Sequence, residues 1–144
     1  MKILVIGGTG LTGKLVTRKF EKLGHEVIIG SPSKGVNIFT GEGLSRAMDG
    51  TEIVIDLSNS SSLEEENAIQ FFEAAGKNLV AAERAVDFRH HILLSIVGTD
   101  DALEIGYLRA KKLQEDTVKN SAIPYTIIRS TQFHEHVEAI IQVQ

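Results

Sequence analysis

Three side chains of this sequence are of types that can pass a proton to a carbonyl oxygen or hydrogen-bond it: Ser95, Tyr107 and Lys111. Tyr107 and Lys111 are four residues apart in the stretch YLRAK, so on a helix both side chains lie on one face. A free tyrosine has a pKa of about 10, and a fixed cation nearby favours the phenolate. Lys111 is therefore expected to lower the pKa of Tyr107 into the range useful for acid or base catalysis. Ser95 lies in HILLSIV, near the carboxyl end of a predicted strand, where it could hydrogen-bond the same oxygen. The Tyr-x-x-x-Lys spacing alone is weak evidence, because such pairs also arise by chance.

A second candidate site is the glycine-rich stretch GGTGLTG, residues 7–13. It fits G-x-G-x-x-G through Gly8, Gly10 and Gly13, and it fits G-x-x-G-x-x-G through Gly7, Gly10 and Gly13. The stretch follows the apolar run KILVI and opens a segment of helical periodicity, which is the context of a dinucleotide-binding turn. A pyrophosphate could then bind to free backbone N–H groups at the positive end of the helix. The alternative is a tight turn whose glycines serve packing alone.

The residues after the second predicted strand indicate which dinucleotide would bind. NAD-binding domains place an Asp or Glu about 20 residues after the glycine stretch, where it binds the ribose 2′-hydroxyl. Here no carboxylate occurs between Glu26 and Glu42, and the strand is followed by GSPSKG. Ser31, Ser33 and Lys34 offer hydroxyl donors and a cation suited to a 2′-phosphate, which favours NADP(H) over NAD(H). The alternative is a solvated surface turn.

The elements that must position these residues follow an α/β pattern. Short apolar runs rich in Ile and Val alternate with longer segments of helical periodicity, which is typical of βαβ units, a mostly parallel sheet and one domain over residues 1–144. The predicted strands are residues 2–6, 25–29, 36–39, 53–57, 91–97 and 125–129. The predicted helices are residues 11–23, 43–49, 63–86, 105–119 and 132 to about the end. Ser62 and Glu65 predict a capping box at the start of the longest helix.

Composition narrows the class of protein. The chain has 144 residues, a formal net charge of -4 and no cysteine, which excludes disulfides, thiolate catalysis and a cysteine-based zinc site. Lys and Arg are dispersed, so we expect no direct binding to nucleic acid. The apolar opening MKILVI ends at Gly7, far short of a membrane span, so we expect a cytoplasmic protein without a membrane segment. His134 and His136 would point to different faces of a helix, and no metal site is expected there.

Four stretches in order resemble the NmrA-like branch of the atypical short-chain dehydrogenase/reductases: GGTGLTG, LLSIVGTD, YLRAKKLQED and SAIPYTIIRSTQFHEH. The resemblance extends over essentially all 144 residues. It implies a doubly wound sheet of strand order 3-2-1-4-5-6, with helices on both faces and NAD(P) bound across its carboxyl edge. It also favours the G-x-x-G-x-x-G spacing, so that Gly7, Gly10 and Gly13 would form the phosphate cradle.

Position by position, the resemblance implies a site along this edge, in which Glu42 faces the adenine and Lys111 holds the nicotinamide ribose. Together with Ser31 and Lys34, the predicted cofactor-binding residues are Gly7, Thr9, Gly10, Leu11, Thr12, Gly13, Glu42, Leu57, Ser58, Asn59 and Lys111. The residues implied to face the substrate are Gln132, Phe133 and His134.

Two departures from the family bear on function. Many members have an arginine directly after the second strand, where this chain has Gly30 and Ser31, so the preference for NADP(H) depends largely on Lys34. Members also usually continue for about another hundred residues, which supply much of the substrate pocket. We expect the surface uncovered by the absence of this part to be apolar and to drive assembly into a homo-oligomer.

The resulting hypothesis is an NADP(H)-dependent reductase of a carbonyl or quinone substrate. Tyr107 would donate the proton, Lys111 would orient the site, and Ser95 would hydrogen-bond the substrate oxygen. One alternative is a redox sensor that binds NADP(H) and acts through a protein partner without turnover, and another is a folded remnant that only binds nucleotide. Many members of the family lack the catalytic tyrosine and act as regulators, so Tyr107 favours an enzyme.

Overall fold

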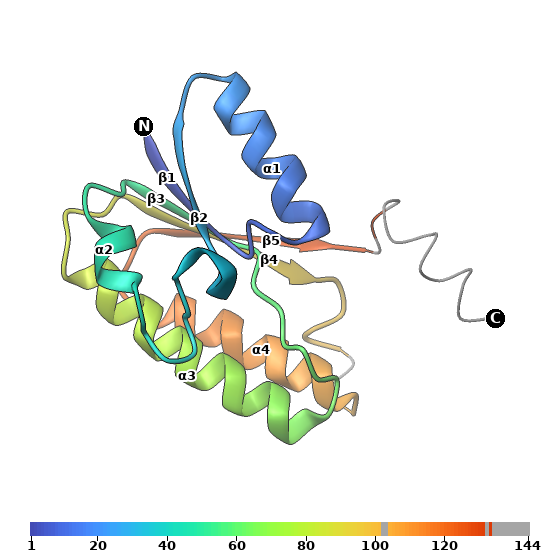
Figure 1. Cartoon of the computed structure of the whole chain (residues 1–144). Helices are drawn as coiled ribbons and strands as arrows, with labels where there is room; N and C mark the ends of the chain where they lie inside the picture. The colour runs from blue at the N-terminus through green and yellow to red at the C-terminus, as the bar shows by residue number, and fades with distance from the viewer. Residues whose placement is uncertain (102–103, 132, 134–144) are drawn as a thin grey trace.

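The computed structural model describes residues 1–101, 104–131 and 133, and the strands of this part form one parallel sheet (Figure 1). They are β1 (Lys2–Ile6), β2 (Glu26–Gly30), β3 (Ile53–Asp56), β4 (His90–Ile96) and β5 (Tyr125–Ser130). They lie in the order β2-β1-β3-β4-β5, and every neighbouring pair is parallel. Parallel neighbours need crossover connections, which the segments between the strands provide.

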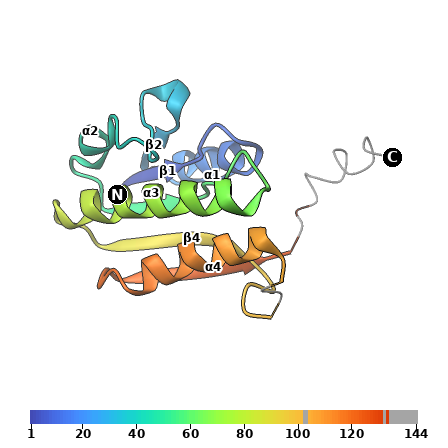
Figure 2. The same cartoon turned by 90° about the horizontal axis from the view of Figure 1, so that it is seen from below.

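Helices cover both faces of this sheet. They are α1 (Leu11–Lys22), α2 (Leu44–Met48), α3 (Glu65–Arg84) and α4 (Gly106–Lys119), with a 3₁₀ turn at Pro32–Lys34. In Figure 1, α1 lies on one side of the strands and α3 and α4 lie on the other. Figure 2 shows α3 and α4 running side by side along the sheet. The predicted doubly wound α/β class is therefore confirmed.

Strand β1 is the centre of the core because its side chains are buried on both faces. Leu4 and Ile6 pack in the apolar cluster that α2 and α3 complete, and Ile3 and Val5 pack in the cluster that α1 completes. Successive residues of a strand point to opposite faces, so a continuous apolar strand is suited to this position. The end of β1, where the glycine stretch begins, is thereby fixed between two packed layers.

The predicted third strand, residues 36–39, is wrong. Val36 and Ile38 are buried, at 5% and 8% exposure, but they belong to a loop in which the Val36 N–H donates to the Ser31 carbonyl oxygen (3.0 Å). Alternation of apolar residues indicated burial here and not pairing in a sheet. The sheet of the described residues has five strands instead of six, and these keep the predicted relative order.

The predicted capping box at Ser62 and Glu65 is also wrong. Helix α3 begins at Glu65, and its N-cap, Glu64, makes no side-chain cap hydrogen bond. The Ser62 hydroxyl accepts a hydrogen bond from the Glu64 N–H (3.2 Å), which forms a local turn before the helix. Glu65 instead accepts a hydrogen bond from Arg109 Nε of α4 (2.6 Å). This carboxylate therefore joins two helices and does not cap its own.

Within the described ranges, α1 packs on β1 and β2, and no helix lies over β4 and β5 on this side of the sheet (Figure 1). Alternate residues of β4 are buried against α3 and α4, so Leu94 faces the opposite side, next to its register partner Ile128 of β5. Ile128 is 50% exposed. Assembly into a homo-oligomer through this apolar surface, expected from the sequence, stays a prediction. No helix within the described ranges is both long and apolar enough to cross a membrane, and the helix predicted from residue 132 lies outside them.

Substitution of Gly13 by alanine is expected to destabilise the fold. A Cβ on Gly13 would lie 2.1 Å from the Gly7 carbonyl oxygen and 2.7 Å from Gly8 Cα, and these backbone atoms cannot rotate away. We expect Gly13→Ala to lower the free energy of unfolding by about 2–3 kcal/mol, the upper part of the range for overpacking. Urea denaturation measures the change.

Gly10→Ala is the matched control in the same turn. Its Cβ would meet the Gly7 carbonyl oxygen at 3.3 Å, a contact that a small shift relieves, so the loss should stay below about 1 kcal/mol. Equal stability of the two variants would contradict the close approach of α1 to the turn.

Candidate functional site

The glycine stretch places the N-terminus of α1 at the carboxyl end of β1. Gly7 adopts a φ of +76°, and its N–H donates to the Gly30 carbonyl oxygen at the end of β2 (2.8 Å). Gly10 closes the turn on the Gly7 carbonyl oxygen (3.0 Å) and is the N-cap of α1. It makes no side-chain cap hydrogen bond, and the first turn of α1 carries no acidic residue. The N–H groups of this first turn are thus available to an anion, so the turn fits the pyrophosphate of a dinucleotide.

A cleft of about 340 Å³, the glycine-turn cleft, lies over the carboxyl ends of β1, β2 and β3. Predicted cofactor residues that line it are Gly7, Thr9, Gly10, Ser31, Leu57, Ser58 and Asn59. Four wall residues, from the loop before α2 and from α3, were not predicted: Val36, Asn37, Ile38 and Phe71. The Phe71 ring stacks on Phe39, with centroids 6.2 Å apart, which gives this end of the cleft a rigid apolar wall suited to a flat base.

Other predicted cofactor residues lie beside this cleft and not in its wall. Leu11 and Thr12 form the first turn of α1, where they contribute backbone N–H groups, and Gly13 packs on Gly7. Lys34 ends the 3₁₀ turn, and Glu42 is exposed. The structure therefore brings the glycine turn and the loop after β3 together but leaves the Glu42 side chain outside the cleft wall.

A cation that was not predicted, Arg46 of α2, approaches the turn after β2. A Cβ built on Gly35 would lie 3.4 Å from Arg46 Nη2, so the guanidinium packs against the backbone next to Lys34. In the same turn the hydroxyls of Ser31 and Ser33 are hydrogen-bonded at 3.2 Å. Ser31 of this turn lines the glycine-turn cleft, and Ser33, Lys34 and Arg46 belong to or contact the same turn outside the cleft wall. Because Arg46 comes from a separate helix, the local sequence gave no signal for it.

A second cleft, of about 670 Å³, continues from the first through Leu57, Ser58 and Asn59, which line both. Its wall contains the predicted catalytic residues Ser95, Tyr107 and Lys111. The other wall residues are mostly apolar: Leu63, Leu94, Ile96, Val97, Ile105, Leu108, Ser130, Thr131 and Phe133. The predicted cofactor loop and the predicted proton donor therefore share one groove.

Tyr107 and Lys111 both line the second cleft, but their polar atoms have different partners. The Tyr107 hydroxyl donates to Asn59 Oδ1 on the shared loop. Burial raises the pKa of Tyr107, and the hydrogen bond to Asn59 only partly offsets this. The prediction that Lys111 lowers the Tyr107 pKa is thus wrong for this structure, because the Lys111 amine donates to Gln114 Oε1 (2.5 Å) and to the Leu94 carbonyl oxygen (3.3 Å).

Lys111 is itself strongly affected by its surroundings. It is 2% exposed, and its ammonium lies over the Phe72 ring, 4.9 Å from the centroid. Burial lowers the pKa of Lys111 to about 8, against the opposing effect of the Asp56 and Glu115 carboxylates. The charge of this amine therefore changes within a physiological range of pH.

The role predicted for Ser95 is corrected by the structure. Ser95 is 1% exposed and its hydroxyl donates to Glu115 Oε1 of α4 (2.6 Å), so the hydroxyl is not directed to a substrate oxygen. The cause is the alternation of β4, which turns His91, Leu93 and Ser95 toward α3 and α4. Ser95 holds the strand to the helix at the edge of the cleft.

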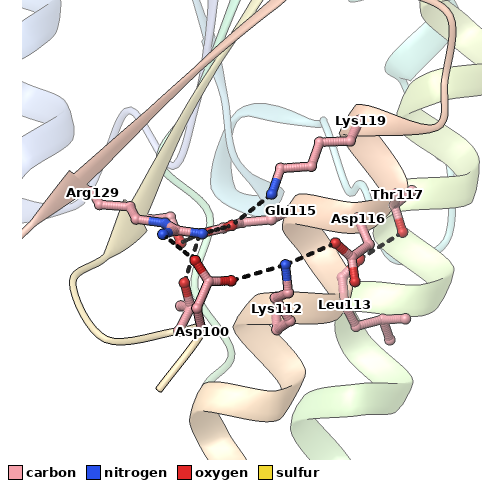
Figure 3. A network of polar contacts seen from close by, with 10 residues as sticks. Asp100, Lys112, Leu113, Glu115, Asp116, Thr117, Lys119 and Arg129 are labelled. Atoms are coloured by element: carbon pink, nitrogen blue, oxygen red, sulfur yellow. Dashed lines mark hydrogen bonds and ion pairs between the residues drawn. The ribbon is translucent and has the colours of Figure 1, made fainter. Parts of the chain in front are cut away.

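An ion-pair network around Glu115 joins β5, α4 and the loop after β4 (Figure 3). Arg129 of β5 donates to both oxygens of Glu115 (3.0 and 2.7 Å) and to Asp100 Oδ2 (2.6 Å). Lys112 adds a second cation to Asp100 (3.1 Å), and hydrogen bonds from Arg129 and Lys112 lower the pKa of Asp100 to about 2. The network fixes the segments on either side of the second cleft.

Some predicted features fall on residues 132 and 134–144, which lie outside the described residues. They are the substrate residues Gln132 and His134 and the pair formed by His134 and His136. Phe133, the third predicted substrate residue, lies in the wall of the second cleft. Among the residues that the structure describes, no group of three or more His, Asp or Glu side chains could hold a metal ion.

The fold, the glycine turn and the joined clefts define a Rossmann-type domain for a dinucleotide. The chain belongs to the NAD(P)H-binding family, whose model matches residues 7–143. The resemblance to the atypical short-chain dehydrogenase/reductases is thereby confirmed at the level of fold and cofactor class.

The individual relatives have low sequence identity to this chain. The chain is 27% identical over 149 residues to the photosystem II assembly factor Ycf39 of Cyanophora paradoxa, and the aligned region covers 94% of this chain and 46% of that protein. It thus spans about half the length of the curated relatives it matches.

Two solved structures illustrate the shared fold. A short-chain dehydrogenase/reductase superfamily protein of Agrobacterium tumefaciens with bound NAD has a TM-score of 0.74 and 20% identity, over 90% of this chain and 48% of that one. The NADPH-dependent quinone oxidoreductase QOR2 of Escherichia coli, complexed with NADPH, has a TM-score of 0.74 and 21% identity, over 98% of this chain and 53% of that one. At such identities the likeness shows the fold alone.

Glu115→Gln is expected to lower stability and to flatten its dependence on pH. Burial raises the pKa of Glu115, but hydrogen bonds from Arg129, Ser95 and Thr99 outweigh burial and hold the pKa at about 2. A carboxyl group whose pKa is lower in the folded state stabilises the fold above its unfolded pKa, and this contribution is lost as the pH falls toward 2. Removing the charge weakens the bonds from Arg129, Ser95 and Thr99, which we expect to cost about 1–3 kcal/mol at pH 7.

Urea denaturation between pH 2 and about 7 tests this expectation. The wild-type free energy of unfolding should fall as the pH drops from about 5 to 2, and the Glu115→Gln curve should be shallower over this window. Glu73→Gln, at an exposed position of α3, is the control and should follow the wild type. Parallel curves for Glu115→Gln and the wild type would refute the role given to this carboxylate.

Proposed function

We propose that this chain is an NADP(H)-dependent reductase that acts on a carbonyl or quinone substrate. The observation that carries the proposal is that Tyr107 and Lys111 line a cleft which continues, through the 57–59 loop, into the glycine-turn cleft. A dinucleotide that extends along this groove from the glycine turn would bring its nicotinamide end beside Tyr107.

In this proposal the glycine-turn cleft would bind the adenine and pyrophosphate of the cofactor, and the second cleft would hold the reacting groups. The first turn of α1 would bind the pyrophosphate, and the wall formed by Ile38 and Phe71 would receive the adenine. When bound, reduced nicotinamide supplies a hydride, which carries two electrons to the carbonyl carbon. Tyr107 would donate its hydroxyl proton to the carbonyl oxygen, so that an alcohol forms and the phenolate regains a proton from solvent.

Lys111 would orient the cofactor in this scheme. An ammonium group has three N–H donors. Two of them bind Gln114 Oε1 and the Leu94 carbonyl oxygen, which leaves the third for a ribose hydroxyl. Because the amine is already held at two points, binding a ribose would require little further ordering.

A preference for NADP(H) over NAD(H) belongs to this proposal. Lys34 and Arg46 flank the turn that carries Ser31, and within residues 1–101, 104–131 and 133 neither cation forms an ion pair with a carboxylate. A 2′-phosphate would supply the missing negative charge, and Ser31 could donate to it.

Titration calorimetry with NADPH and NADH tests the preference. We expect NADPH to bind at least about tenfold more tightly, a difference of about 1.4 kcal/mol. Lys34→Ala and Arg46→Ala should each weaken NADPH about fivefold to tenfold and leave NADH unchanged, since each removes one charge-assisted contact to the phosphate. Lys22→Ala, at the far end of α1, is the control. Equal affinities would remove the preference, and a chain that binds neither dinucleotide would overturn the proposed function.

Tyr107→Phe tests the reductase reaction. With a panel of quinones and aldehydes, the rate of NADPH oxidation should fall at least about 100-fold, because the proton donor is lost. The dissociation constant for NADPH should stay within about twofold, since the hydroxyl donates to Asn59 in the free protein. Tyr125→Phe, on the outer strand β5, is the matched control and should be fully active. Wild-type rates in Tyr107→Phe would exclude Tyr107 as the proton donor.

A second candidate is an NADP(H)-binding module that acts through a protein partner without turnover. Two observations favour it: the Ser95 hydroxyl is bonded to Glu115, and the pKa of Tyr107 is raised. The name of the Cyanophora paradoxa relative, a photosystem II assembly factor, also suggests action on a protein. Tight binding of NADPH without turnover in the wild type, together with no effect of Tyr107→Phe, would favour the module.

A further inference from the structure

The Gln114 side chain of α4 connects the Lys111 amine with the loop that both clefts share. Its carbonyl oxygen accepts from Lys111 Nζ at 2.5 Å. Its amide nitrogen donates to Asp56 Oδ2 and to the Ser58 hydroxyl, each at 3.2 Å. Gln114 is 3% exposed, so these contacts are made without competition from solvent.

The orientation of the Gln114 amide is determined by Asp56 at the end of β3. An ionised carboxylate only accepts hydrogen bonds, so the NH₂ group must face Asp56 and the carbonyl oxygen must face Lys111. Asp56 in turn accepts from the Ser58 N–H at 2.9 Å, which fixes the start of the shared loop. One glutamine therefore sets both the position of the amine and the shape of the loop opposite to it.

Next to Asp56 lies a buried pair of side chains, His91 and Glu83. His91 Nδ1 lies 2.6 Å from Glu83 Oε1, and His91 Nε2 lies 3.9 Å from Asp56 Oδ2. His91 and Glu83 are each 1% exposed, and His91, Gln114 and Asp56 line a cavity of about 10 Å³. At 3.9 Å His91 Nε2 does not hydrogen-bond Asp56, so the Asp56 carboxylate is held by the Ser58 N–H and the Gln114 amide, in surroundings where burial strengthens these bonds.

We propose that Gln114 is a positioning residue that holds the Lys111 amine and the Ser58 loop in one geometry and thereby couples the two clefts of the cofactor groove. This inference rests on the proposed function, since its effect on affinity assumes that NADP(H) binds there. The charged groups that act on the Lys111 amine are Asp56 of β3 and Glu115 of α4, and Phe72 of α3 faces it with an aromatic ring. Gln114 is the neutral acceptor between them.

Two substitutions separate the two functions of the amide. Gln114→Met keeps the length of the side chain and removes both its acceptor and its donors. Gln114→Glu keeps an acceptor for Lys111 but cannot donate to Asp56 or Ser58 when ionised. Gln70→Met, at an exposed position of α3, is the matched control.

The first measurement is the titration of Lys111 by NMR on the full chain without cofactor. Loss of a hydrogen bond to the charged amine should lower the Lys111 pKa in Gln114→Met, and Gln114→Glu should restore or raise it. The second is the dissociation constant for NADPH between pH 6 and 9. We expect both variants to bind NADPH at least about tenfold more weakly. The affinity for NADPH should fall as rising pH deprotonates Lys111, and only in Gln114→Met should this fall occur at lower pH.

The outcomes distinguish this proposal from the proposed function. A Lys111 titration unchanged in Gln114→Met, or NADPH affinity within twofold of the wild type in that variant, would overturn the role of Gln114. If the wild type binds no dinucleotide, the proposed function fails, yet the Lys111 titration still decides whether Gln114 positions the amine. If Gln114→Met does not fold, Gln114→Glu carries the test, because a wild-type affinity in that variant would show that the donors to Asp56 and Ser58 are not needed.

Discussion

The contact between Gly13 and the turn at Gly7 is the constraint on which the cofactor groove depends. A Cβ at residue 13 would overlap the Gly7 carbonyl oxygen, so only glycine lets α1 begin directly against the end of β1. That approach directs the first N–H groups of α1 to the carboxyl edge of the sheet, where the glycine-turn cleft lies. It also lays α1 across one sheet face, where Val16 and Phe20 pack on the cluster around Ile3 and Val5.

The other face of the sheet differs in that polar side chains are also buried there, between β4 and the helices α3 and α4. His91 and Ser95 of β4 point toward α3 and α4 and meet Glu83 and Glu115. Their hydrogen bonds offset part of the cost of burying polar groups, and they tie the strand to the two helices, although His91 Nε2 and Glu83 Oε2 have no hydrogen-bond partner among the described residues. Lys111 lies on the same helix as Glu115, so the contacts that hold Glu115 also help to fix the position of Lys111.

The sequence predicted the features whose signal is local. The glycine turn, the strands β1 and β4 and the placement of Tyr107 on a helix all depend on neighbouring residues, and these are present in the structure. Other features depend on which side of an element a residue faces or which distant element it meets, and these were predicted wrongly or missed. Ser95 was expected to face the substrate, and alternation of β4 turns it inward. The contacts of Arg46 and Gln114 could not be predicted, because their partners lie on elements that are distant in the sequence.

The raised pKa of Tyr107 bears on how readily its proton can be transferred in the second cleft. A phenol whose pKa is raised by burial stays protonated at neutral pH, but it is a weaker acid than a free tyrosine. A donor to a carbonyl oxygen must start in the protonated state, whereas the weaker acidity makes the proton transfer itself less favourable. A cation brought close to the hydroxyl would lower this pKa, but Gln114 and Leu94 hold the Lys111 amine. In the free protein the Tyr107 phenol is therefore protonated and only weakly acidic.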